Sequence, residues 1–203
     1  WKEIRLEHAL KHPNWAMGPK NTIDSATMAN KGIELIEAHH LFEMPVSRIQ
    51  VVIHPQSMVH SLVRTVDGFL YAQVSQPDMR MVIQNALTYP RLEGACCGTL
   101  DLAGKNLSFL PVDYRKYRLL ALAYQAVERG GPFPVVYNAA NEVAFEQFLA
   151  EAISFIEIPI TVEETLNADW SSPTGSIEEI LDLNELARRK AAEIVGNRRR
   201  AAS

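Results

Sequence analysis

The chain has 203 residues, of which 47% are hydrophobic and 22% are charged. A chain of this length buries roughly 70% of its unfolded surface on folding, which excludes a disordered tail. Twenty Lys and Arg against twenty-four Asp and Glu leave a net charge of −4, without the basic excess of a nucleic-acid-binding protein. No apolar run approaches the ~20 residues that span a bilayer. We therefore expect a soluble protein with neither nucleic acid nor a membrane as partner.

The cysteines and the first residue indicate the setting of the chain. Cys96 and Cys97 are adjacent, which suits neither a long-range disulfide nor a metal knuckle, so we interpret them as packing residues in a reducing cytosol. The chain begins at Trp1, with neither a charged leader nor a secretory segment. We expect that a longer sequence preceded Trp1 and was removed by processing or by the choice of the chain ends.

The first predicted helix follows a loop rich in Pro and Gly, residues 12–20. Asp24 and Ser25 offer N-cap oxygens to a helix that reaches about Phe42. Its apolar residues follow helical spacing and predict a buried stripe of Ala26, Ala29, Ile33 and Ile36. A neighbouring face carries Thr27, Asn30, Lys31 and Glu34.

The next stretch predicts a small sheet and a helix. Residues 49–53 are β-rich, and 58–66 pairs with 69–74 across Asp67-Gly68, a hairpin signal. A helix starts near Asp78 and stops before Pro90. The fold class predicted for this half is α+β.

Beyond Pro111 the pattern is helical. Four segments are predicted, at 115–129, 135–151, 159–168 and 176–195, and short connections favour a four-helix bundle. Ser176 and Glu179 form a capping box, and residues 197–203 should fray. We expect an α+β domain at 1–93, a linker at 94–110 and a C-terminal helical bundle at 111–203.

The polar face of the first helix carries the chemistry. Free N–H groups with Ser25, Asn30 and Lys31 are typical of a phosphate site, and Glu34 adds a hard oxygen ligand for Mg²⁺ or Mn²⁺. The structural alternative is that Ser25 is an ordinary helix cap and that Lys31 and Glu34 form a solvated i,i+3 ion pair. His54 and His60 are more often structural hydrogen-bonders than catalysts at such positions.

Six motifs occur in register and carry a resemblance. They are His12-Pro-Asn-Trp-Ala-Met-Gly-Pro-Lys20, Ile23-Asp-Ser-Ala-Thr-Met28, Asn30-Lys-Gly-Ile-Glu34, Ile53-His-Pro-Gln-Ser57, Pro77-Asp-Met-Arg80 and Asn138-Ala-Ala-Asn-Glu142. Together they resemble the C-terminal half of the 1-deoxy-D-xylulose 5-phosphate reductoisomerases. These are enzymes of the non-mevalonate isoprenoid pathway that use NADPH and a divalent metal.

The resemblance implies roles for several residues. His12, Ser25, Asn30 and Lys31 would bind the substrate, and Glu34 would bind both the metal and the substrate, so that His12 and Glu34 are the catalytic candidates. The lid over the substrate would contain Trp15 and Met17, with Gly18 close to NADPH. The roles of His60 and of the Asn138–Glu142 motif are left unassigned.

The implied reaction converts 1-deoxy-D-xylulose 5-phosphate to 2-C-methyl-D-erythritol 4-phosphate with NADPH and Mg²⁺, Mn²⁺ or Co²⁺. The chain has no Gly-rich nucleotide fingerprint, and it lacks the family's acidic pair of metal ligands. We expect the partner of this chain to be an N-terminal nucleotide-binding half. The complete enzyme would be a homodimer of the bacterial cytoplasm or of a plastid. We expect the isolated chain to be inactive. Two alternatives are a non-catalytic sugar-phosphate-binding or assembly module and a different sugar-phosphate enzyme.

Overall fold

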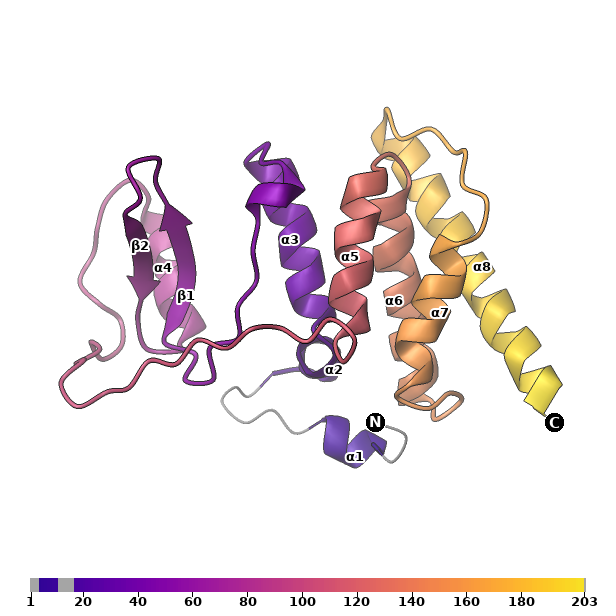
Figure 1. Cartoon of the computed structure of the whole chain (residues 1–203), viewed down its shortest axis with the longest axis horizontal. Helices are drawn as coiled ribbons and strands as arrows, with labels where there is room; N and C mark the ends of the chain where they lie inside the picture. Colours follow the sequence, from indigo (N-terminus) through magenta and orange to yellow (C-terminus); the bar gives the residue numbers. More distant parts are fainter. Residues whose placement is uncertain (1–3, 11–16, 203) are drawn as a thin grey trace. The chain divides into compact units, whose positions relative to one another are not determined.

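The computed structural model describes residues 4–10 and 17–202. The chain forms two compact units, one of residues 1–51 with 113–203 and one of residues 52–112 (Figure 1). These boundaries differ from the expected sequence-ordered division at 93 and 111, because the first helices pack on the last ones. The domain division itself stays a prediction about the family's architecture.

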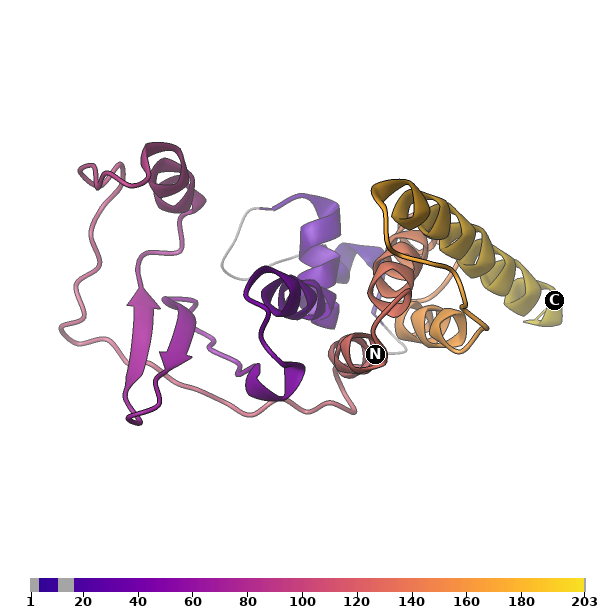
Figure 2. The same ribbon diagram turned by 90° about the horizontal axis from the view of Figure 1, so that it is seen from above.

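The N-terminal part of the first unit is helical. Its elements are α1 (Leu6–Ala9), α2 (Pro19–Thr27), α3 (Ala29–Leu41) and the short 3₁₀ helix η1 (Val46–Arg48). Helix α3 packs beside α5 (Arg118–Arg129), and α2 contacts both of them (Figure 1 and Figure 2). The N-terminal helices therefore share a core with the C-terminal ones.

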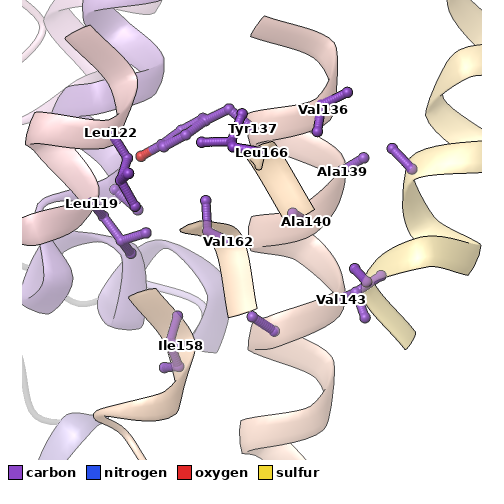
Figure 3. Close-up of a cluster of buried hydrophobic side chains, with 14 of the residues drawn as sticks. Leu119, Leu122, Val136, Tyr137, Ala139, Ala140, Val143, Ile158, Val162 and Leu166 are labelled. Atoms are coloured by element: carbon purple, nitrogen blue, oxygen red, sulfur yellow. The ribbon is translucent and has the colours of Figure 1, made fainter. Parts of the chain in front are cut away.

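Four C-terminal helices form the rest of this unit and confirm the four predicted segments, with shifted ends. After α5 come α6 (Phe133–Leu149), α7 (Glu157–Leu166) and α8 (Ile177–Ala202). Helix α6 lies at the centre and contacts α5, α7 and α8. Buried side chains such as Leu122, Tyr137 and Val162 meet between α5, α6 and α7 (Figure 3). Apolar burial of this kind dominates the stability of the unit.

Helix α8 packs through a seam of buried residues with a spacing of four, namely Leu183, Ala187, Ala191 and Val195. The capping box is confirmed, since Glu179 N donates to Ser176 Oγ at 3.2 Å and Ser176 N donates to Glu179 Oε2 at 3.2 Å. The expected fraying after 197 is wrong, because the helix continues to Ala202. Arg198 supports this last stretch by pairing with Glu164 of α7 at 2.6 Å.

The second unit contains the predicted hairpin. Strands β1 (Val59–Arg64) and β2 (Leu70–Val74) pair antiparallel, with Leu62 opposite Ala72, across a turn in which Gly68 has φ +91°. Such a φ favours glycine, which has no Cβ. Helix α4 (Met79–Thr88) starts near Asp78 and ends before Pro90, as predicted, and its N-cap Asp78 accepts a hydrogen bond from Arg80 N. The expected strand at 49–53 is reduced to a single bridge between Ile53 and Leu110.

The described residues are thus mostly helical with one two-stranded sheet, so the α+β expectation holds in its coarse form. Among these residues, no helix combines the length and the apolar character needed to cross a membrane.

Candidate functional site

Helix α2 begins earlier than the sequence predicted. Pro19 occupies its first turn after the N-cap Gly18, and Thr22 Oγ1 donates to Gly18 O at 3.0 Å. Proline suits this position because the missing N–H would have no partner there. The expectation that Asp24 and Ser25 cap a helix is wrong, because both lie inside α2. The half-buried Ser25 can therefore offer its hydroxyl to a ligand, but it does not mark the N-terminus of a helix.

The predicted single helix is broken at Met28, which adopts the left-handed conformation with φ 59°. Thr27 stabilises the break, since its Oγ1 donates to Ile23 O at 3.0 Å and accepts from Ala29 N at 3.3 Å. Thr27 is consequently buried and does not join the polar face. The break also changes the helical register, so that Ala26 is exposed, whereas Ala29 is fully buried as predicted.

A polar cluster, Asn30, Lys31 and Glu34, lies at the start of α3. Asn30 Nδ2 donates to Glu34 Oε1 at 2.6 Å, and Lys31 Nζ donates to Glu34 Oε2 at 2.5 Å. The side chains of Lys31 and Glu34 are 46% and 47% exposed, so they are accessible to a ligand. Asn30 and Lys31 also occupy the first helical turn, where N–H groups have no intrahelical acceptor and can bind anions.

The geometry of this cluster alone is also that of a solvated ion pair. Lys190 and Glu193 of α8 make a pair of the same i,i+3 spacing at 3.1 Å. What differs is the surroundings, because the α3 pair adds an amide and lies next to the helix that carries Ser25.

Helix α2 carries one member of a buried polar pair that the sequence did not reveal. Asp24 is 3% exposed and Asn141 of α6 is 1% exposed, and Asn141 Nδ2 donates to Asp24 Oδ1 at 3.0 Å. Lys20 forms an ion pair with the other carboxylate oxygen. Residues 135–144 contain three polar residues, Asn138, Asn141 and Glu142, so no local pattern singled out Asn141, and its partner Asp24 is 117 residues away.

The lid residues are only partly described. His12 and Trp15 lie outside the described residues, so their predicted roles stay predictions. Met17 is half-buried and Gly18 is exposed directly before α2. A Cβ placed on Gly18 would meet nothing within 4 Å, so its backbone is open to a ligand.

Metal-binding groups are sparse in the described part of the chain, which has no cluster of three or more His, Cys, Asp or Glu side chains suited to an ion. Glu34 would therefore be a single protein ligand, and its hard carboxylate oxygens suit Mg²⁺ or Mn²⁺.

The second unit contains His54 and His60. His54 Nδ1 lies 2.8 Å from Ser108 O and its ring stacks on Phe109, which favours the structural interpretation. His60 Nε2 lies 3.3 Å from Ser75 O. Cys96 and Cys97 are free, and partial desolvation together with the charge of Asp78 raises the pKa of Cys97, which keeps it a thiol.

Comparisons with known proteins identify the fold. Residues 74–190 match the model of the DXP reductoisomerase C-terminal domain, and residues 1–42 match the 1-deoxy-D-xylulose 5-phosphate reductoisomerase C-terminal domain. The chain is 44% identical over 197 residues to the 1-deoxy-D-xylulose 5-phosphate reductoisomerase of Halothermothrix orenii, covering 97% of the chain and 51% of the relative. It is 49% identical over 195 residues to that of Desulfitobacterium hafniense strain DCB-2, covering 96% and 51%.

Solved structures agree. The Zymomonas mobilis enzyme in complex with NADPH matches with a TM-score of 0.88 at 38% identity, over 96% of this chain and 50% of that one. A DOX-P reductoisomerase in complex with NADPH, fosmidomycin and magnesium matches with a TM-score of 0.87 at 40% identity, over 96% and 50%.

These matches place the fold in the C-terminal half of a reductoisomerase. The chain belongs to the 1-deoxy-D-xylulose 5-phosphate reductoisomerase family, as the six motifs implied. It spans about half the length of the curated relatives it matches.

Proposed function

We propose that this chain supplies the phosphate-binding helices and one metal ligand of an enzyme that converts 1-deoxy-D-xylulose 5-phosphate to 2-C-methyl-D-erythritol 4-phosphate. Membership in the family supports this reaction, and related structures hold NADPH and magnesium. The observation that carries the proposal is the convergence of the Asn30 amide and the Lys31 ammonium on Glu34.

The hydrogen bonds of this cluster suggest how it works. Lys31 and Asn30 now donate to the two oxygens of Glu34. A substrate phosphate offers these donors other acceptors, with charge-assisted hydrogen bonds that are stronger than neutral ones. Transfer of the donors to phosphate then leaves the Glu34 carboxylate free for a cation, so phosphate and metal binding reinforce each other.

The neighbouring residues would complete the substrate site. Ser25 on α2 contributes a hydroxyl to the phosphate, and His12 contacts the substrate from the loop before α2. Trp15, Met17 and Gly18 belong to a lid that excludes water, with Gly18 beside NADPH. Phosphate binding away from the reacting carbons orients the substrate.

Glu34 fits a metal site only in part, because one carboxylate is too few ligands for a divalent cation. When bound, the cation supplies Lewis-acid stabilisation of negative charge, and NADPH supplies the hydride. The other ligands and the nucleotide-binding domain would come from an N-terminal half, so we propose that these 203 residues alone are inactive. We place the whole enzyme, a homodimer, in the bacterial cytoplasm, because the relatives are bacterial.

The proposal is tested by Lys31→Ala in the full-length enzyme that carries this sequence. A charge-assisted contact is worth roughly 1.5–3 kcal/mol, so KM for the sugar phosphate should rise about ten- to hundredfold. Lys190→Ala is the matched control, because it removes a lysine from an i,i+3 pair elsewhere on the surface. Equal steady-state kinetics for both variants would mean that Lys31 only forms an exposed ion pair with Glu34 and does not bind the phosphate.

A further inference from the structure

Helix α6 holds α2 through a buried charged contact. Asp24 of α2 and Asn141 of α6 are each at least 97% buried, and the amide donates to the carboxylate at 3.0 Å. A buried carboxylate without hydrogen-bond donors is costly, and a carboxylate can only accept, so the amide of Asn141 is a required partner. Lys20, 31% exposed at its side chain, neutralises the other oxygen from the surface. Asp24 immediately precedes Ser25 in the chain.

The same helix holds α3 one turn earlier. Tyr137 of α6 is fully buried, and a Cβ added to Gly32 would lie 2.5 Å from its Oη and 2.8 Å from Ala123 Cβ. Only glycine therefore allows α3 to approach α5 and α6 this closely. Gly32 lies directly after Lys31 and two residues before Glu34.

Tyr137 and Asn141 are four residues apart and so lie on one face of α6. Both face the N-terminal helices, because one contacts Asp24 and the other fills the space over Gly32. Burial and the Asp24 charge raise the pKa of Tyr137, which keeps the phenol neutral beside the buried carboxylate. In Figure 3 its ring extends from α6 toward α5.

We infer that Asn141 is a positioning residue for the substrate phosphate, which it serves through Asp24, while Tyr137 fixes α3. One face of α6 thereby sets Ser25 on α2 at a defined distance from Asn30, Lys31 and Glu34 on α3. Because the break at Met28 divides α2 from α3, the two parts of the site lie on separate helices, and α6 contacts both of them. The inference rests on the proposed function, since it assigns a task to the phosphate site described above.

The test is Asn141→Leu in the full-length enzyme, which keeps the number and branching of the side-chain heavy atoms and leaves Asp24 without its donor on α6. We expect KM for 1-deoxy-D-xylulose 5-phosphate to rise about tenfold, as for the loss of one charge-assisted hydrogen bond. KM for NADPH should stay unchanged, and calorimetry should show a matching rise in Kd for the sugar phosphate without NADPH.

Asn138→Leu is the matched control. Asn138 lies one turn earlier on α6, and its amide donates to Glu142 Oε1 at 3.2 Å. Glu142 pairs with Arg188 of α8, so this contact belongs to the α6–α8 side and not to α2 or α3. It should leave both KM values unchanged. A lower kcat and melting temperature for Asn141→Leu, with both KM values unchanged, would mean a purely structural role and would overturn the inference.

Two further variants keep the test decisive. If Asn141→Leu does not fold, Asn141→Ser keeps a shorter donor and must still raise KM for the sugar phosphate, and an unchanged KM would refute the inference. Lys31→Ala separates the two claims. If Lys31→Ala raises KM and Asn141→Leu does not, the positioning role fails while the proposed function stands. If Lys31→Ala has no effect, the proposed function itself fails.

Discussion

Replacing Gly32 by alanine tests how tightly the site-bearing helix α3 is packed. The new Cβ would lie 2.5 Å from Tyr137 Oη, 2.8 Å from Ala123 Cβ and 3.2 Å from Tyr137 Cζ. Both neighbours are fully buried, and Ala123 Cβ is attached to a helix backbone, so it cannot rotate away. Helix α3 must therefore shift.

The magnitude follows from two opposing effects. Overpacking of a core typically costs about 1–3 kcal/mol. Alanine in a helix interior gains about 0.5–1 kcal/mol over glycine. With two contacts closer than 3.0 Å, the upper part of the overpacking range applies, and Gly32→Ala should lower the free energy of unfolding by about 1–2 kcal/mol.

Urea denaturation of the 203-residue chain, followed by far-UV circular dichroism, measures this change as a lower midpoint at constant slope. The matched control is Gly196→Ala in α8, where a Cβ would meet nothing within 4 Å. That substitution should stabilise the chain by up to about 1 kcal/mol through helix propensity.

A double variant identifies the contact responsible. Tyr137→Phe removes the buried hydroxyl, which has no hydrogen-bond partner among the described residues, and so should be nearly neutral alone. Combined with Gly32→Ala it removes the closest contact, so part of the lost stability should return. If Gly32→Ala stabilises the chain as Gly196→Ala does, the close packing of α3 on α6 is refuted.

Three further predictions concern the metal, the isolated chain and pH. Glu34→Gln in the full-length enzyme should lower metal affinity and kcat together, whereas Glu193→Gln should not; unchanged metal dependence in a metal titration would reject Glu34 as a ligand. The 203-residue chain alone should show no substrate-dependent NADPH oxidation, and calorimetry should show only weak Mg²⁺ binding. Turnover or tight Mg²⁺ binding would contradict the proposal that this chain supplies only one metal ligand. Hydrogen bonds from Arg80 lower the pKa of Asp78 to about 2, so the capped end of α4 should keep its stability above the ordinary Asp pKa and lose it as pH falls toward about 2. Arg80→Ala should raise the Asp78 pKa in an NMR titration, and an unshifted titration would exclude this pairing.

The sequence determined the elements that depend on neighbouring residues. Asp67-Gly68 gave the hairpin, Asp78 gave the start of α4 and Ser176 with Glu179 gave the start of α8, because each signal acts within a few residues. The i,i+3 and i,i+4 spacings likewise brought Lys31 and Asn30 to Glu34. The six motifs in register also predicted the family, which the comparisons confirmed.

Tertiary structure decided where the first helix breaks and which residue pairs with Asp24. Local preference did not reveal the left-handed Met28, since α2 and α3 gain more by packing separately on the C-terminal helices. Asp24 looked like a helix cap until Asn141, 117 residues later, provided its donor. The hydrogen bond to this carboxylate is strengthened by its low-dielectric surroundings, and only the folded chain provides that environment.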